Sequence, residues 1–264
     1  MKHFVTNKNS AWLFALLMMF FSTSSLFSRG QDLLDKVMSN DLEGVKELVS
    51  AGADLNIKDD MMDFTPLILS VYSGNKEMAE FLLSKGADIN LPEERTGYTP
   101  LMHALDNNNA EMARFLIDKG TDIKIKANDG TTALILACGV SPDIAKYLLL
   151  RGADIHALTD KGQGVFTQCI ISMIKGNQDI TPEFAEYLLD KGAEIDEKNS
   201  GEGFKGYTPL LWAIIYCEPE IIRFLIENGA DVNTLVEGGK TPLSLAYENC
   251  SEHIIELLKK HGAK

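Results

Sequence analysis

Apolar residues along this chain recur at helical spacing in short runs that end at a glycine. Two clear examples are EMAEFLLSKG (Glu77–Gly86) and EIIRFLIENG (Glu220–Gly229), in which apolar side chains return every three or four residues. This periodicity predicts amphipathic helices. The closing glycine is the residue expected where a chain leaves a helix through a left-handed conformation. The residues after it are rich in Asp, Asn and Gly, which predicts a turn.

A second set of short helices is predicted from Thr-Pro pairs upstream of these runs. A Thr hydroxyl can accept a hydrogen bond from a free N–H of the first turn, and Pro at the first helical position has no N–H to leave unpaired. The first such helix is expected over residues 66–73. The starts are Thr65-Pro66, Thr99-Pro100, Thr208-Pro209 and Thr241-Pro242, with Thr132-Ala133 and Gly164-Val165 at the intervening places. The following helices start most clearly at Ser141-Pro142, Thr181-Pro182 and Glu218-Pro219.

These helix pairs form a repeat. The steps between successive starts are 34, 33, 32, 44 and 33 residues, so one step is out of line. Helices of this length are marginal alone in water, and each pair must bury its apolar faces against its neighbours. A period between 20 and 50 residues therefore predicts one stacked array rather than a globular domain.

Residues 60–90 closely resemble the ankyrin repeat, because they carry T-P-L (65–67), G-N-x-E-x-A (74–79) and L-L-x-x-G-A-D-I-N (82–90). The resemblance covers about 31–264. It implies an all-α fold, a solenoid of about seven helix-turn-helix repeats in which first helices line a concave face and finger turns project beside it. The repeats are expected at approximately 31–60, 61–94, 95–127, 128–159, 160–203, 204–236 and 237–264, within a repeat domain of residues 29–264, with the first and last acting as polar caps.

The family's usual histidine after Thr-Pro-Leu is absent from every repeat. Its places are taken by Ile68, Met102, Ile135, Thr167, Leu211 and Ser244. We therefore expect that the loop-to-loop hydrogen bonds implied by the resemblance are not made by this position.

The fifth repeat is irregular. Gly164 and Gly192 are 28 residues apart where other repeats have 21, which places seven extra residues around MIKGNQDI (173–180). A second insertion, EKNSGEGFKG (197–206), enlarges the next finger turn. Insertions in repeat proteins map to loops that are often functional.

Residues 1–28 lie outside the array and have the layout of a signal peptide. Lys2 and Lys8 precede an apolar run, AWLFALLMMFF (11–21), and a small-residue stretch, STSS (22–25), with cleavage expected near residue 25. The alternative is an uncleaved inner-membrane anchor, although the run is short for a membrane span. Either interpretation places the repeats outside the cytoplasm, in the periplasm or secreted.

The charge and the cysteines restrict the possible partners. The formal net charge is −13 at pH 7, which repels phosphate backbones and argues against nucleic-acid binding. Stacked helices lie about 8–10 Å apart, whereas a disulfide needs Cα atoms within about 7 Å. Equivalent places in adjacent repeats are held by Cys217 and Cys250, and nearly so by Cys138 and Cys169, so we expect four free thiols. Without CxxC or paired histidines, no metal or other cofactor is predicted.

No catalytic group is predicted. GGKT (238–241) lacks the first glycine of a phosphate-binding loop and fits a turn leading to a helix cap. The histidines are scattered and have no Ser, Cys or acidic partner at a family spacing. An acid–base set in the insertions would have to come from Asp179, Glu183, Glu202 and Lys205, which fit equally well as solvated turn charges.

We therefore expect a monomeric, non-catalytic protein-binding scaffold that uses the groove and fingers. In the ankyrin-like unit the exposed groove side chains come four, seven and eight residues after the helix-start Thr, and the finger contributes the residue before it. Large apolar side chains at or near these places are Phe64, Leu69, Tyr72, Tyr98, Phe204, Tyr207, Trp212, Ile215 and Tyr216. The acidic remainder favours a basic or neutral partner protein. The alternative is an inhibitor or immunity-type protein, or an accessory subunit of an enzyme, acting through repeats five and six.

Overall fold

The computed structural model describes residues 29–236 and 238–264, and in this part of the chain all regular structure is helical. The helices form seven consecutive antiparallel pairs, which confirms the all-α repeat fold. The first helices of the pairs are α2 (Arg29–Met38), α4 (Pro66–Tyr72), α6 (Pro100–Asp106), α8 (Ala133–Val140), α10 (Val165–Ile174), α12 (Pro209–Tyr216) and α14 (Pro242–Asn249). The second helices are α3 (Leu42–Ser50), α5 (Lys76–Ser84), α7 (Ala110–Asp118), α9 (Pro142–Leu150), α11 (Pro182–Asp190), α13 (Pro219–Glu227) and α15 (Glu252–Lys260).

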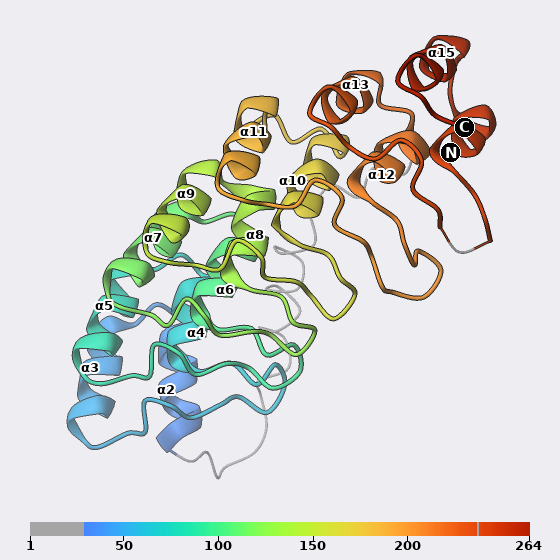
Figure 1. Cartoon of the computed structure of the whole chain (residues 1–264). Helices are drawn as coiled ribbons and strands as arrows, with labels where there is room; N and C mark the ends of the chain where they lie inside the picture. Colours follow the sequence, from blue (N-terminus) through green and yellow to red (C-terminus); the bar gives the residue numbers. More distant parts are fainter. Residues whose placement is uncertain (1–28, 237) are drawn as a thin grey trace.

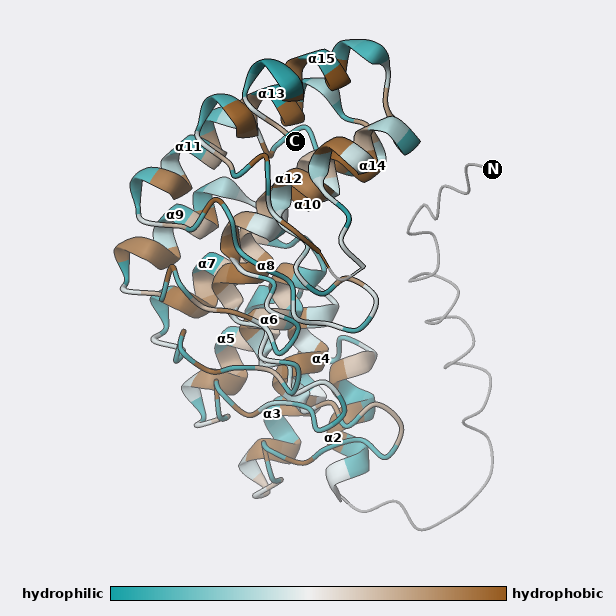
Figure 2. Cartoon of the chain, turned by 45° about the vertical axis from the view of Figure 1, so that its right-hand side comes forward, coloured by the Kyte–Doolittle hydropathy of each residue, from teal (hydrophilic) through white to brown (hydrophobic). Residues whose placement is uncertain are grey.

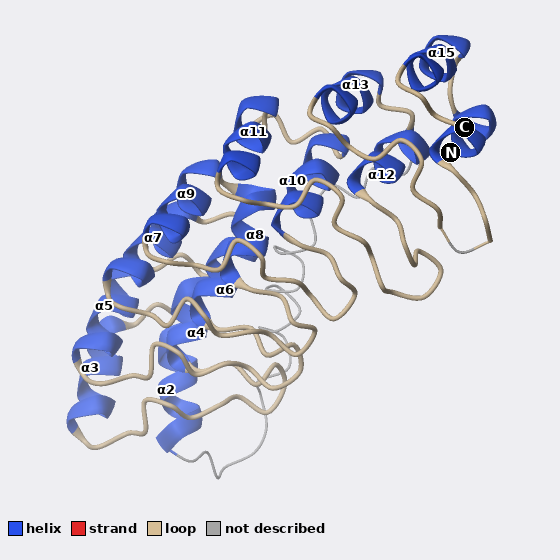
Figure 3. Ribbon diagram, viewed as in Figure 1, coloured by secondary structure: helices blue, strands red, loops and turns tan. Residues whose placement is uncertain are grey.

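The pairs stack into an elongated, gently curved array (Figure 1). The first helices form an inner row and contact one another from α2 through α14 without interruption. The second helices form an outer row, and the finger turns project on the other side of the inner row (Figure 3). Apolar residues concentrate where the two rows meet, and polar residues dominate the turns (Figure 2). One continuous hydrophobic core therefore runs the length of the stack.

The predicted helix starts are confirmed at most repeats. The hydroxyls of Thr65, Thr99, Thr132 and Thr241 accept hydrogen bonds from the N–H three residues later, at 3.1, 3.4, 3.3 and 3.2 Å. The residue that donates is the one standing in the family's histidine position. Its side chain is fully buried in four repeats, as Ile68, Met102, Ile135 and Leu211. These apolar replacements extend the core instead of bonding to the loops.

Other side chains connect the loops that follow the second helices. Each is an Asn or Asp two residues after the Asp (or Glu) of the GAD-type turn, and it accepts a hydrogen bond from a backbone N–H of the next repeat. The pairs are Asn56 with Asp88, Asn90 with Asp122, Asp196 with Asp231 and Asn233 with Lys264, at 2.8, 2.8, 3.1 and 2.9 Å. The loops are thus bonded to one another without the histidine, through residues that the sequence comparison did not single out.

The finger turns are also bonded side by side. Backbone N–H groups of Asn128, Asp160 and Ser200 donate to carbonyls of the preceding finger, at Thr96, Asp129 and Lys161, over 2.7–2.8 Å. Main-chain bonds of this kind hold neighbouring fingers at a fixed spacing. They make the third to sixth fingers one connected surface beside the inner helices.

The extra residues of the fifth repeat are divided between a helix and a loop. Helix α10 has 10 residues, whereas α4 and α6 have 7 each. The connection from α10 to α11 spans residues 175–181, compared with 107–109 between α6 and α7. In the fourth repeat, by contrast, Ser141 alone separates α8 from α9. The array therefore carries its shortest and longest inter-helix connections side by side.

A buried carboxylate replaces the missing threonine cap of α10. Glu197, from the following finger, is 5% exposed and accepts hydrogen bonds from the Thr167 N–H at 2.9 Å and the Thr167 hydroxyl at 2.6 Å. Burial raises the pKa of Glu197, although these hydrogen bonds lower it in part. An anion at a helix N-terminus is stabilised by the free N–H groups there. Gly164 provides the room, because a Cβ at this position would lie 2.3 Å from the Glu197 carboxylate.

All four cysteines are free, and Cys138 and Cys169 are buried. Cys217 and Cys250 hold equivalent places as the residues that cap the C-terminal ends of α12 and α14. The Cys250 thiol donates to the Ile214 carbonyl at 3.4 Å, the same oxygen that accepts from the Cys217 N–H at 3.0 Å. Burial and the contact with the Cys217 thiol raise the pKa of Cys250 to about 12.

The capping of α10 gives a test by three variants. Glu197→Ala removes the cap and should cost about 1–2 kcal/mol of unfolding free energy. Gly164→Thr should also destabilise, because the new Cβ collides with the carboxylate. In Gly164→Thr/Glu197→Ala the threonine hydroxyl can cap the helix in the vacated space, so the combined loss should be clearly smaller than the sum. Urea unfolding followed by circular dichroism measures this, and additive losses would contradict the assignment.

Candidate functional site

The predicted surface residues gather at two places where a finger turn meets its first helix. We call Phe204, Tyr207 and Trp212 the repeat-six cluster. We call Phe64, Tyr72, Tyr98 and His103 the repeat-three cluster. In both, one ring comes from the residue before the helix start and another from the fourth residue after it.

The three rings of the repeat-six cluster contact one another directly. Phe204 lies 4.8 Å from Trp212 and 5.4 Å from Tyr207, and the Tyr207 and Trp212 centroids are 5.7 Å apart. Phe204 is 43% exposed, whereas Tyr207 and Trp212 are half-buried. Trp212 is therefore partly core and partly surface. Its indole N–H is buried and has no hydrogen-bond partner in the described part of the chain.

The inserted finger holds Phe204 against the helix. Asn199 forms a pair of main-chain bonds, donating to the Tyr207 carbonyl at 2.9 Å and accepting from the Gly206 N–H at 2.7 Å. The Asn199 side chain accepts from the Gly201 N–H at 2.7 Å, which closes the loop further. The insertion thus has a structural consequence: it folds back and adds one ring to the surface.

Further apolar residues extend the repeat-six cluster along α12. Tyr216 is 59% exposed and lies four residues after Trp212, on the same side of the helix. Ile215 is half-buried beside it. In the next finger Leu235 is 64% exposed. Large exposed apolar side chains are therefore concentrated near this end of the array.

The repeat-three cluster is more deeply packed than predicted. Phe64 is only 6% exposed, so the expectation that it lines the surface is wrong; its ring is held between Tyr72 at 6.0 Å and His103 at 4.9 Å. Leu69 is half-buried and packs against the core. Tyr72 and Tyr98 remain half-exposed. They are the members of this cluster that a partner can reach.

Sequence reasoning did not place His103 in the core. The ring is 8% exposed and stacks edge-on to Phe64 and to Tyr98, the latter at 5.7 Å. Burial lowers the pKa of His103 to about 4, although the negative charge of Glu93 acts to raise it. The side chain is therefore neutral at pH 7. Aromatic residues precede both helix starts, at Phe64 and Tyr98. In the sequence they were the signal that rings would bury the side chain at position 103.

Between the clusters the same positions carry smaller or polar residues. The finger position is Thr131 and Gln163 in repeats four and five, and the helix position is Leu136 and Gln168. The two clusters are separated by three repeat steps, or roughly 25–30 Å at the usual helix spacing. They are two separate contact points along one face.

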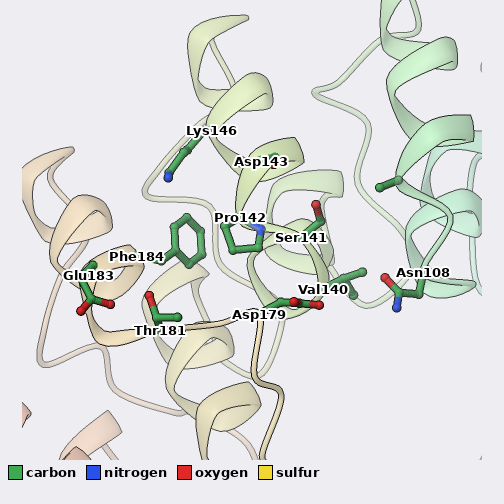
Figure 4. A pocket seen from close by; sticks show the side chains of 11 residues that line it. Asn108, Val140, Ser141, Pro142, Asp143, Lys146, Asp179, Thr181, Glu183 and Phe184 are labelled. Carbon is green, nitrogen blue, oxygen red and sulfur yellow. The ribbon is translucent and has the colours of Figure 1, made fainter.

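A recess of about 450 Å³ lies at the tips of the helix pairs of repeats three to five. It forms where the single-residue connection at Ser141 faces the long connection before α11. Asn108 lies on its opposite side from Glu183, with Lys146 and Phe184 between (Figure 4). The Lys146 ammonium is 5.9 Å from the Phe184 ring centroid.

Neither a metal site nor a membrane span is found in the described residues. Within 29–236 and 238–264, no group of three or more His, Cys, Asp or Glu side chains is placed to hold a metal ion. Over the same ranges, none of the helices has the length and apolar character needed to cross a bilayer.

The buried His103 predicts a pH-dependent stability. Its folded pKa of about 4 lies below the ordinary value of 6.5, so between these values the unfolded chain binds a proton that the folded chain does not. The stability is present above pH 6.5 and is lost as pH falls, by about 3 kcal/mol near pH 4. Leucine stands at the equivalent positions 69 and 136 of other repeats. In urea unfolding, His103→Leu should therefore lose less stability than wild type between pH 6.5 and pH 4.

His156→Gln, in an exposed turn, is the matched control and should behave as wild type. Equal losses in wild type and His103→Leu would mean that His103 is protonated in the folded protein.

Known proteins share the repeat pattern. The family model "Ankyrin repeats (3 copies)" matches residues 33–127, 92–159 and 170–264. The chain is 32% identical to the mouse B-cell lymphoma 3 protein homolog over 124 residues, which cover 46% of this chain and 26% of that protein. It is 28% identical to the ankyrin repeat protein YahD of Escherichia coli strain K12 over 141 residues, 52% of this chain and 60% of YahD.

A third relative is a bacterial ankyrin repeat protein of Borreliella burgdorferi, 31% identical over 90 residues, which are 34% of this chain and 37% of that protein. Each match spans less than two thirds of the relative, so these similarities concern the repeats and not the whole proteins. The family matches include most of the residues that form the seven helix pairs. From its sequence period, its stacked helix pairs and these matches, the chain belongs to the ankyrin repeat family.

Proposed function

We propose that this protein is a non-catalytic scaffold that binds another protein along the face where its first helices meet its fingers. Ankyrin repeat domains generally mediate protein–protein interaction, and proteins of this family are typically binding scaffolds rather than enzymes. The repeat-six cluster is the proposed centre of binding.

The observation that carries this proposal is the exposure of aromatic side chains around α12. Phe204 and Tyr216 are 43% and 59% exposed, and Trp212 and Tyr207 lie half-buried beside Phe204. A contiguous apolar surface is unfavourable in water unless something covers it. Trp and Tyr are also enriched among the residues that dominate binding energy at protein interfaces.

The charge of the chain bears on the chemistry of the partner. The formal net charge of the chain is −13 at pH 7. Complementary charge steers association and disfavours like-charged partners. A basic or neutral protein bound to a monomeric array is the proposed complex.

The proposed location is outside the cytoplasm. Its support is the sequence of residues 1–28, which lie outside the described residues, with two lysines, an apolar run and small residues in the order of a signal peptide. An uncleaved anchor would also place the repeats outside.

A second candidate is an inhibitor or immunity-type protein, or an accessory subunit of an enzyme, that acts through repeats five and six. The recess beside Phe184 and the enlarged finger around Phe204 favour this version, because both arise from the insertions. Here the partner would contact the helix-pair tips as well as the fingers.

The binding proposal is tested by removing the most exposed rings. Phe204→Ala/Tyr216→Ala should weaken partner binding by more than about 2 kcal/mol, roughly thirtyfold, because these side chains lose buried contact area. Because both are exposed in the free protein, the melting temperature should stay close to that of wild type. The measurement is affinity capture from an extract of the native host, then titration of the protein identified by mass spectrometry.

Leu150→Ala removes an exposed apolar side chain, 78% exposed, from the outer-row helix α9. This control should bind as wild type does. A repeat-six variant that folds and binds normally would place the interface elsewhere. Loss of binding in a variant of the recess, such as Lys146→Ala/Glu183→Ala, with normal binding by the repeat-six variant would favour the second candidate.

Export is tested separately by the intact mass of the protein isolated from its host. Cleavage near residue 25 should remove the segment that contains Lys2 and Lys8, and it takes the formal charge from −13 to −15. A mass that includes Met1–Ser22 would instead support the anchored form.

A further inference from the structure

The repeat-three cluster differs from the repeat-six cluster in the charges around it. Tyr72 and Tyr98 are its half-exposed rings, and they stand on either side of the buried Phe64 and His103 rings. Asp106 lies three residues after His103 in α6, on the same side of the helix. Asp106 is the residue of its repeat that is equivalent to Tyr72 in the preceding repeat. The helices that carry them, α4 and α6, are in contact. A carboxylate therefore lies beside the aromatic surface.

Asp106 is exposed, and its carboxylate has no hydrogen-bond or ion-pair partner among the described residues. Neighbouring atoms nevertheless desolvate the carboxyl group in part, which raises its pKa. Partly desolvated carboxylates are stabilised by a cation brought close to them. This site lacks one in the free protein.

The other charges that act on the Tyr98 phenol are also acidic. Burial, then the charges of Asp106, Asp129 and Glu93, raise the pKa of the Tyr98 phenol. His103 is neutral, so it does not offset them. Of the lysines of the neighbouring finger, Lys58 is already bonded, to Asp63 at 2.8 Å and to Glu94 at 3.4 Å.

Aromatic faces with an unpaired carboxylate match the chemistry of a basic side chain. A cation over a Tyr or Phe face is attracted by the ring, and the attraction grows when the site is partly desolvated. Arginine fits better than lysine, because its planar guanidinium stacks on rings while its N–H groups donate to a carboxylate.

We propose that the surface formed by Tyr72, Tyr98 and Asp106 receives an arginine side chain of the partner protein, with the guanidinium against the Tyr98 ring and paired with Asp106. This inference rests on the proposed protein-binding function and names the chemistry of one contact in it. The repeat-six cluster, where Lys240 pairs with Glu248 near Tyr207, would receive an apolar segment of the same partner.

The test uses the full repeat array and a small probe, so it does not require the partner. Nitrogen-15-labelled protein is titrated to tens of millimolar with acetyl-arginine methylamide and followed by NMR. We expect saturable shifts at the amides of residues 72, 98 and 106 and their neighbours, and none around Trp212. The citrulline analogue, which has the same shape without the charge, should produce no saturable shift there.

Two variants locate the interaction. Asp106→Asn should raise the apparent dissociation constant at least about fivefold, because the charge-assisted hydrogen bonds are lost. Tyr98→Phe should retain binding, since the ring face remains, and Tyr98→Ala should abolish it. Glu227→Gln removes an exposed carboxylate from the last turn of α13 and is the matched control for charge; it should leave the titration unchanged.

The proposal is overturned if no saturable shift is seen, if the citrulline analogue binds equally, or if Asp106→Asn and Glu227→Gln behave alike. It is also overturned if the shifts spread without saturation over the acidic surface, since that is the result expected of general counter-ion binding. These outcomes leave the capture experiment with the repeat-six variants unaffected. If the capture experiment fails but the arginine probe still binds, the arginine site stands and only its role in contacting a partner protein is lost.

Discussion

The structure depends on burial of the first helices between their neighbours. Each of them is 10 residues long or shorter, which is too short to be stable alone in water. Their apolar residues are covered on two sides by adjacent repeats, as shown by Leu67, Leu101 and Leu134, each at most 1% exposed. Every other feature of the fold, including the bonded fingers and loops, depends on this stacking because it sets the distance from one repeat to the next.

The proposed binding surface follows from the same constraint. A stacked array must bury the inward face of every first helix, but it leaves the side that meets the fingers free to vary. At repeats three and six that side carries rings, and at repeats four and five it carries Thr131, Gln163 and Gln168. The two clusters differ in their charges, acidic around Tyr98 and mixed around Tyr207. One face can thus make two chemically distinct contacts with a single partner.

The irregular repeats show how the array accommodates insertions. Added residues in repeat five lengthen α10 and the connection to α11, and neither change interrupts the contact of α10 with α8 and α12. The enlarged finger is bonded to the finger before it through Ser200, and it supplies both Glu197 to the start of α10 and Phe204 to the repeat-six cluster. An insertion on the loop side of a solenoid can therefore gain a structural and a surface role without loss of the stack.

The sequence by itself determined the period, the helix starts and the positions of the clusters. Thr-Pro pairs and helical periodicity act within a few residues, so α4, α6, α12 and α14 begin where the pattern predicts, and aromatic residues at fixed places in successive repeats gather because the repeats are equivalent. The tertiary structure decided the contacts between residues about 30 positions apart. Glu197 caps α10, Asn56 and Asn90 bond the next loop, and Phe64 and His103 are buried, because each depends on which side chain of an adjacent repeat fills the available space. No local pattern specifies that choice.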